Sequence, residues 1–176
     1  MIERVRSILN LPGLQLFTDP EFGSRQPDHR KRIREAIFAN FPDSPGVLDL
    51  GLLPELNGAS VSISHTQTLG GYALSPGLTL IGFDLELTSR ISSSQLQRVS
   101  RYQPESKASP GPEFLWTAKE ASFKAVAVSL GLRVLADVVI LNWVKEDDAS
   151  YFFEAEHFKG VAWSAGDYTY AISRSK

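Results

Sequence analysis

Residues 60–87 read SVSISHTQTLGGYALSPGLTLIGFDLEL and contain three segments with the pattern of β-strands. Small polar and apolar residues alternate over 60–65, the segment 72–75 follows a Gly-Gly turn, and 78–87 is a longer strand-like run. Because the side chains of a strand alternate between two faces, the last segment can present apolar residues on one face and polar residues on the other. This stretch therefore predicts a β-hairpin followed by a third strand.

Two helices are predicted on either side of these strands. The longer one runs from about Glu113 to Leu130, and Gly131 follows it as the residue type that commonly closes a helix. The other begins after Asp28, a residue type that caps helices, and runs to about Phe41 because apolar residues recur there at helical spacing.

The rest of the chain gives weaker signals. Residues 1–27 are expected to be irregular apart from a short amphipathic helix at the start, because three prolines break any longer element. Residues 91–102 have a polar, helical pattern, whereas 103–112 are predicted as a loop rich in Pro, Ser and Gly. The C-terminal strand candidates are 138–145, 151–156, 161–164 and 168–173.

The two halves of the chain carry similar hairpin sequences. The segments 61–64 (VSIS) and 72–75 (YALS) near the middle are echoed by 161–164 (VAWS) and 170–173 (YAIS) near the end. Two interpretations stay open: a duplication that produced two similar lobes, or a chance likeness, since such patterns are common to β-hairpins.

Composition indicates a globular protein of one domain or two small fused lobes. The chain has 176 residues, of which 43% are hydrophobic and 22% are charged, and this is sufficient for a core without covalent cross-links. The absence of cysteine excludes disulfides, thiolate metal sites and a cysteine nucleophile.

Charge and hydropathy argue against two classes of partner. The net charge of −2 gives no indication of binding to nucleic acid or to an anionic membrane. No apolar run approaches the ~20 residues of a membrane span, and the N-terminal residues lack the pattern of a signal peptide. A cytoplasmic protein is therefore expected. Basic residues are concentrated locally, between Arg25 and Arg34.

The strand around residue 84 carries two acidic side chains. Asp84 and Glu86 project from one face, while Phe83, Leu85 and Leu87 project from the other. Neighbouring carboxylates repel one another unless a cation lies between them, and a set of oxygen ligands is typical of Mg²⁺. The alternative is a half-exposed edge strand whose acidic residues are simply solvated.

The predicted long helix also carries charged residues on one face. Glu120 and Lys124 are four residues apart, and Trp116 lies one turn earlier on the same side. In one interpretation Glu120 completes an acidic metal site and Lys124 holds a phosphate. In the other, the two residues form an ordinary surface ion pair.

A third group of polar residues ends the first strand. Ser64, His65 and Thr66 precede a glycine-rich turn and can bind a phosphate through hydroxyl, imidazole and backbone N–H groups. The alternative is a structural or merely exposed histidine. A Ser–His hydrolase is excluded because adjacent strand residues point to opposite faces and the chain has no G-x-S-x-G motif.

Taken together, the order and spacing of these segments resemble the 4′-phosphopantetheinyl transferase superfamily, specifically its larger surfactin-synthetase-activating type. Residues 63–66 (ISHT) match I-S-H-[ST], and residues 82–86 (GFDLE) match G-[IVF]-D-[IVL]-E. Residues 116–124 (WTAKEASFK) match W-[ST]-x-K-E-[AS]-x-x-K. The motif-level match covers roughly residues 28–132, and the C-terminal strands match in general character only.

The resemblance implies an α+β fold of two similar lobes related by a pseudo-twofold axis, with the active site between them. Residues 1–77 would form the N-terminal lobe, and residues 78–176 the C-terminal lobe with the metal site and catalytic helix. The implied activity is Mg²⁺-dependent transfer of the 4′-phosphopantetheine arm of coenzyme A to a serine of an apo acyl or peptidyl carrier protein, releasing 3′,5′-ADP. A monomer is expected.

The resemblance also implies roles for individual residues. Asp84, Glu86 and Glu120 would bind Mg²⁺, and Lys124 would bind the pyrophosphate of coenzyme A. The general base is less defined in the family. We expect Glu120, or a water molecule that it orients, to act on the acceptor serine.

Three further residues match positions that contact coenzyme A: Arg30, Ser64 and His65, the last near the 3′-phosphate. Arginine suits this task because its guanidinium binds phosphate in a planar, bidentate manner. The other basic residues of this segment, Lys31, Arg32 and Arg34, are expected to form a solvated helix face.

One segment departs from the family pattern. The segment Pro54-Glu55-Leu56-Asn57 lacks the lysine often found before the Ser-His strand, which puts the affinity for coenzyme A in doubt. Two other functions are therefore weighed: a non-catalytic relative that binds coenzyme A or a carrier protein, and an unrelated Mg²⁺-dependent phosphotransferase. The second lacks a P-loop or kinase motif to support it.

Overall fold

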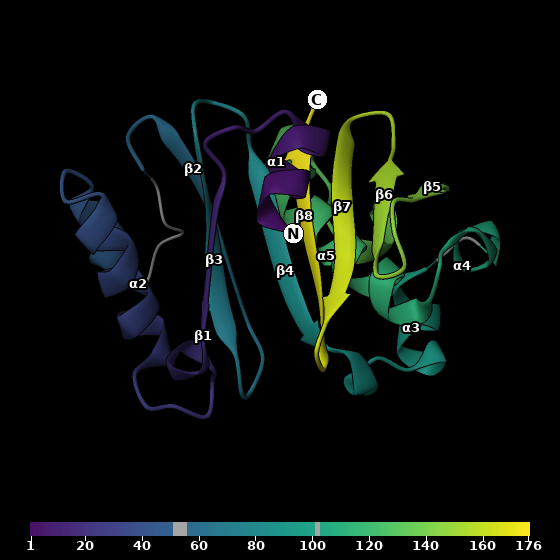
Figure 1. The fold of residues 1–176 in the computed structure, drawn as a ribbon, viewed down its shortest axis with the longest axis horizontal. Helices are drawn as coiled ribbons and strands as arrows, with labels where there is room; N and C mark the ends of the chain where they lie inside the picture. Colours follow the sequence, from purple (N-terminus) through teal and green to yellow (C-terminus); the bar gives the residue numbers. More distant parts are fainter. Residues whose placement is uncertain (51–55, 101–102) are drawn as a thin grey trace.

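The computed structural model describes residues 1–50, 56–100 and 103–176 (Figure 1). Its helices are α1 (Ile2–Leu9), α2 (His29–Asn40), α3 (Ser93–Val99), α4 (Gln103–Ala108) and α5 (Pro112–Leu130). Its strands are β1 (Gln15–Asp19), β2 (Ala59–His65), β3 (Gly70–Pro76), β4 (Ile81–Leu87), β5 (Asn142–Lys145), β6 (Ser150–Glu154), β7 (Phe158–Ala165) and β8 (Tyr168–Ser175).

The described strands form two antiparallel sheets. The smaller sheet has the order β1-β3-β2, and the larger one has the order β4-β8-β7-β6-β5. Separate helices and antiparallel sheets confirm the predicted α+β class. Both predicted hairpins are present, since β2 pairs with β3 and β7 pairs with β8. One hairpin belongs to each sheet, while the duplication itself stays a prediction.

Both flanking helices are present at the predicted places. α2 follows Asp28, whose backbone is left-handed (φ 59°) and whose side chain makes no capping hydrogen bond. Gly131 follows the last residue of α5 and has a φ of 63°. Backbone N–H groups at this end of the helix donate to the carbonyls of Ala127 and Val128. Gly131 therefore closes the helix in the manner expected for glycine.

Several predictions differ from the structure, among them the start of the strand expected at 78–87, which begins only at Ile81. Strand β1 lies in a region expected to be irregular, because it is an exposed edge strand without apolar alternation and is held by pairing with β3. Helix α4 occupies the predicted loop at 103–112, because Glu105 is fully buried and anchors it to the core. The first C-terminal strand begins only at Asn142, after a 3₁₀ turn at Leu135–Asp137. Residues 101–102 of the predicted helix lie outside the described residues.

Each sheet is covered by a helix that also borders the candidate site. α2 packs on the smaller sheet through Ile33 and Ile37, which contact Tyr72 and Leu74. α5 lies against one face of the larger sheet, as Figure 1 shows. The contact is so close at Gly82 that a Cβ atom there would lie 1.8 Å from the Ala121 carbonyl oxygen.

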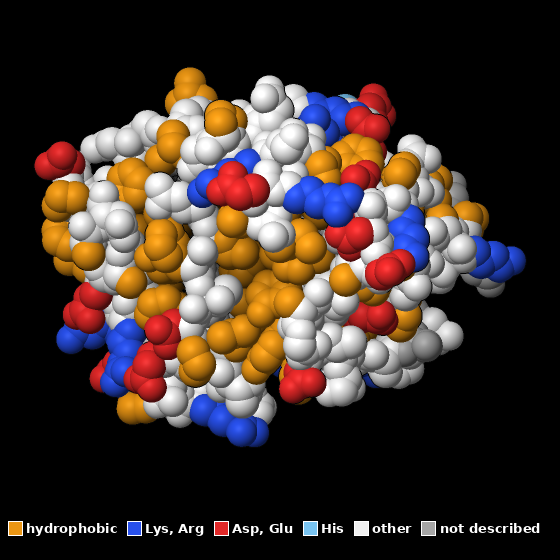
Figure 2. All heavy atoms as spheres, in the orientation of Figure 1, with side chains coloured by type: hydrophobic (Ala, Val, Ile, Leu, Met, Phe, Trp, Pro, Cys, Tyr) orange, Lys and Arg blue, Asp and Glu red, His pale blue; other side chains and the backbone are white. Residues whose placement is uncertain are grey.

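The opposite face of the larger sheet is covered in part by α1. Val5 and Leu9 of this helix share a cluster with Phe83, Leu85 and other residues of the sheet. Figure 2 shows hydrophobic side chains gathered on this face beside α1. In the described ranges, no helix has both the length and the apolar character needed to cross a membrane.

Candidate active site

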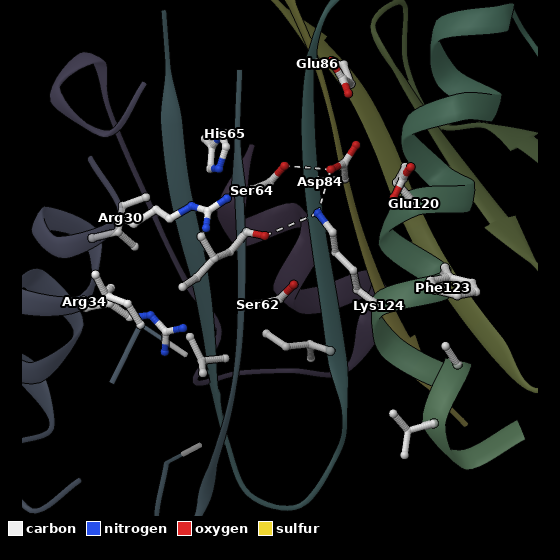
Figure 3. Close-up of a pocket in the computed structure, with 17 residues that line it drawn as sticks. Arg30, Arg34, Ser62, Ser64, His65, Asp84, Glu86, Glu120, Phe123 and Lys124 are labelled. Atoms are coloured by element: carbon white, nitrogen blue, oxygen red, sulfur yellow. Dashed lines mark hydrogen bonds and ion pairs between the residues drawn. The ribbon is translucent and has the colours of Figure 1, made fainter. Parts of the chain in front are cut away.

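A cleft of about 930 Å³ opens between the two sheets, with α2 and β2 on one side and β4 and α5 on the other (Figure 3). Its lining includes every residue that the sequence predicted for the site: Arg30, Ser64, His65, Asp84, Glu86, Glu120 and Lys124. The first three come from α2 and β2, and the others come from β4 and α5. The fold thus brings three separate sequence motifs to one cleft, with cationic residues and carboxylates facing one another across it.

The wall formed by β4 and α5 carries an excess of negative charge. Asp84 is 3% exposed, and neither its Oδ2 nor Oε2 of Glu86 has a hydrogen-bond partner among the described residues. Burial, and next the charge of Asp84, raise the pKa of Glu86 to about 7. Burial, and next Asp84, also raise the pKa of Glu120, while Lys124 lowers it. The positive charge near these three carboxylates is therefore not sufficient to balance their negative charge.

This donor set fits a divalent cation. Two unpartnered, buried carboxylate oxygens and a third carboxylate nearby provide oxygen ligands only, as Mg²⁺ prefers. Within the described ranges no three carboxylates or imidazoles are already grouped closely enough to hold a metal ion. Binding of an ion at Asp84, Glu86 and Glu120 would therefore require their side chains to turn toward one another.

Lys124 supplies the nearest positive charge. Its Nζ donates to Asp84 Oδ1 at 2.8 Å, to the Phe83 carbonyl at 3.0 Å and to the Ile63 carbonyl at 3.3 Å. An ammonium group has three N–H donors, so all of them are used within the protein. Lys124 therefore has to release at least one of these contacts, for which Asp84 is the obvious candidate, before it can bind a phosphate.

Ser64 lies on β2, but its side chain forms hydrogen bonds with residues of β4. Its hydroxyl donates to Asp84 Oδ1 at 2.7 Å and accepts from the Leu85 N–H at 3.3 Å. The side chain is 7% exposed. The single donor of Ser64 is thus directed at Asp84, and its contact with coenzyme A stays a prediction.

His65 lies on the opposite, cationic wall. Its ring meets the His29 ring edge-on with centroids 4.7 Å apart. Burial lowers the pKa of His65, and so do the charges of His29, Arg30 and Lys124. Such a concentration of cationic groups favours a bound anion. His29 was not singled out from the sequence, although its position beside Arg30 in the basic segment offered a signal.

Arg34 corrects the prediction of a wholly solvated basic helix face. It is 8% exposed, lines the cleft and donates from Nη1 to the Val47 carbonyl at 3.2 Å. Burial lowers its pKa, and Asp49 partly offsets this effect. Lys31 and Arg32, by contrast, form exposed ion pairs with acidic residues, as expected.

A buried ion pair beside the site was missed. Lys119 and Glu105 are both fully buried, with Nζ 2.7 Å from Oε1. The same oxygen accepts from the Ile140 N–H at 2.8 Å, and Oε2 accepts from the Ser100 hydroxyl at 2.9 Å. This network fixes α5 one residue before Glu120. The lysine was visible within the matched motif, but Glu105 lay in a predicted loop and gave no signal.

No protein-family model matches this chain, and a search of curated proteins finds no significant match. The function of this chain is therefore inferred from the residues of the cleft and their geometry.

Proposed function

We propose that this protein is a 4′-phosphopantetheinyl transferase of the surfactin-synthetase-activating type. It would transfer the 4′-phosphopantetheine arm of coenzyme A to a serine of an apo acyl or peptidyl carrier protein and release 3′,5′-ADP. One observation carries the proposal: the three motifs that resemble this superfamily line one cleft, where Ser64, Asp84 and Lys124 are joined by hydrogen bonds.

The charges of the cleft suit coenzyme A, which carries about four negative charges. Arg30, Arg34 and His65 line one wall, where they can bind the phosphates of the nucleotide. Asp84, Glu86 and Glu120 on the other wall would hold Mg²⁺. When bound there, Mg²⁺ supplies positive charge against the pyrophosphate as the bond to the leaving group breaks.

The residues of α5 would act on the reacting groups. Glu120 is the candidate general base because it lines the cleft on α5, and because burial and next Asp84 raise its pKa, against the effect of Lys124, which makes it a better proton acceptor than an exposed carboxylate. It would take the proton of the acceptor serine, directly or through a water molecule. Lys124, once released from Asp84, would place its ammonium on the phosphate oxygens.

The proposed fold has two similar lobes. Two sheets, each with a hairpin and a covering helix, support two similar lobes at 1–77 and 78–176 related by a pseudo-twofold axis. With the cleft formed between the sheets of one chain, the enzyme would act as a monomer. Binding of nucleic acid or a membrane is not expected, and the proposed location is the cytoplasm.

Intact-mass spectrometry of an apo carrier protein tests this function. Incubation with the protein, coenzyme A and Mg²⁺ should add about 340 Da, the mass of the arm attached as a phosphodiester. Omission of Mg²⁺ should abolish the gain, and a carrier whose acceptor serine is replaced by alanine should show none. Absence of a mass gain with several different carriers would reject the transferase.

One observation favours a second candidate, a non-catalytic relative that binds coenzyme A or a carrier protein. All three donors of Lys124 are satisfied inside the protein, which is the arrangement expected if this lysine only stabilises the structure. Calorimetric titration with coenzyme A, read together with the carrier mass, tests this candidate: binding of coenzyme A without a gain in carrier mass would favour it, whereas a gain in mass would exclude it.

A further inference from the structure

The two walls of the cleft meet at strands β2 and β4, which belong to different sheets. β2 pairs along its backbone with β3, and β4 pairs along its backbone with β8. Each of the two strands is thus an edge of its own sheet, and the N–H groups along its open side need other partners. How these edges are joined determines where the two walls lie relative to each other.

Three serines of β2 join the edges. The N–H groups of alternate β4 residues donate to serine hydroxyl oxygens of β2 in three bonds: Ile81 to Ser60 at 3.0 Å, Phe83 to Ser62 at 2.8 Å and Leu85 to Ser64 at 3.3 Å. The offset is 21 residues at every bond, so the strands run parallel in one fixed register. We call these three bonds the serine ladder.

The serine ladder sits next to the chemistry of the cleft. The last serine, Ser64, also donates to Asp84 Oδ1. Lys124 bridges the same two strands, because it donates to the Ile63 carbonyl of β2 and to the Phe83 carbonyl of β4. A shift of one strand along the other would therefore disturb Asp84 and Lys124 together.

Ser62 accepts the central bond of the ladder, and replacing this residue tests the ladder most directly. Its side chain is 6% exposed, and its partner Phe83 is fully buried. Unlike Ser64, Ser62 makes no contact with the charged residues of the site among the bonds described for it. Loss of its hydroxyl would leave a buried N–H without a partner and would weaken the attachment between the sheets.

We propose that Ser62 is a positioning residue, which acts through the serine ladder to hold the Ser64–His65 wall in register with the Asp84–Glu86 wall. The ladder is a structural inference in its own right, and only its effect on turnover rests on the proposed transferase function. α2 packs on the smaller sheet, so the cationic wall moves with β2 when the ladder loosens. Binding of the nucleotide to that wall should then persist while alignment of the reacting groups is lost.

Amide hydrogen exchange in S62A tests the ladder without any ligand. Loss of the central bond should speed exchange at Phe83 by about 10-fold or more, and at Ile81 and Leu85 by a similar factor, because the three bonds open together. S173A is the matched control: Ser173 lies on β8 opposite Gly82, is fully buried and is hydrogen-bonded to Ser122, outside the ladder. An effect confined to Phe83, or an equal effect in S173A, overturns the proposal.

Steady-state kinetics with coenzyme A and an apo carrier test the alignment of the reacting groups, and S173A controls for a loss of folded enzyme. S62A should lower kcat by about 10-fold or more, as small misplacements of reacting groups do, with KM for coenzyme A changed by less than about threefold. S62T, which keeps the hydroxyl, should restore kcat, and S173A should leave it unchanged. Equal kcat in S62A and the wild type overturns the positioning role. If the wild type shows no transfer, the proposed function fails and the exchange experiment alone decides the ladder.

Discussion

Replacement of Glu86 by glutamine should change the pH dependence of stability in a defined direction. The pKa of this carboxyl is raised from 4.5 to about 7, first by burial and next by Asp84. A carboxyl whose pKa is higher in the folded state contributes stability that is fully present below its unfolded pKa and is lost as pH rises through the folded value. Without a divalent ion, the protein should therefore lose stability between about pH 4.5 and pH 7.

The size of this loss follows from the shift. At about 1.36 kcal/mol per unit, the full shift corresponds to roughly 3.4 kcal/mol. Solvent reaches part of the Glu86 side chain and screens its charge, so we expect about 2 kcal/mol. The E86Q variant carries no charge at this position, and this part of the loss should be absent from it.

Urea unfolding in EDTA at pH 5 and pH 8 measures the effect. The free energy of unfolding of E86Q minus that of the wild type should be about 2 kcal/mol larger at pH 8 than at pH 5, which means that E86Q is relatively more stable at the higher pH. Added Mg²⁺ should stabilise the wild type at pH 8 and should have a smaller effect on E86Q. A difference between the two proteins that is the same at both pH values would refute the reasoning about this carboxylate.

Three further substitutions test other parts of the structure. Glu105→Ala leaves the buried charge of Lys119 without its partner and should lower the free energy of unfolding by about 3–5 kcal/mol; a loss below ~1 kcal/mol in urea unfolding would show that the pair is not an anchor. Gly82→Ala places a methyl group against the Ala121 carbonyl and should cost about 3 kcal/mol or more, so a melting temperature equal to that of the wild type would contradict the close packing of α5 on β4. His65→Ala should raise KM for coenzyme A with a milder effect on kcat, and an unchanged KM in steady-state kinetics would remove this residue from the nucleotide site.

The elements that the sequence predicted well are those determined by local patterns. α5 could be bounded because Gly131 marks its end, and α2 could be bounded because Asp28 precedes a helical apolar repeat. Strand β1 and helix α4 carry no such pattern. They are held by contacts with distant residues, as when β1 pairs with β3 and Glu105 of α4 binds Lys119. Such contacts are not visible in the residues of the element itself.

The same distinction applies to the candidate site. The sequence identified seven of the residues that line the cleft, because residue type and order suffice for that step. The burial of Arg34, the three bonds of Lys124 and the serine ladder depend on how the two sheets are placed against each other. Alternating serines in β2 are a common strand pattern, so only the structure shows that they bind the backbone of β4.

The transferase proposal is tested most directly by the mass of an apo carrier protein incubated with coenzyme A, Mg²⁺ and one of three enzymes: the wild type, E120Q or E113Q. Glu120 lines the cleft, whereas Glu113 lies in the first turn of the same helix and does not line it, so the two variants are matched in chemistry and element. We expect a gain of about 340 Da with the wild type and with E113Q, and none with E120Q. A gain with E120Q at the wild-type rate, or no gain with the wild type, would contradict the account.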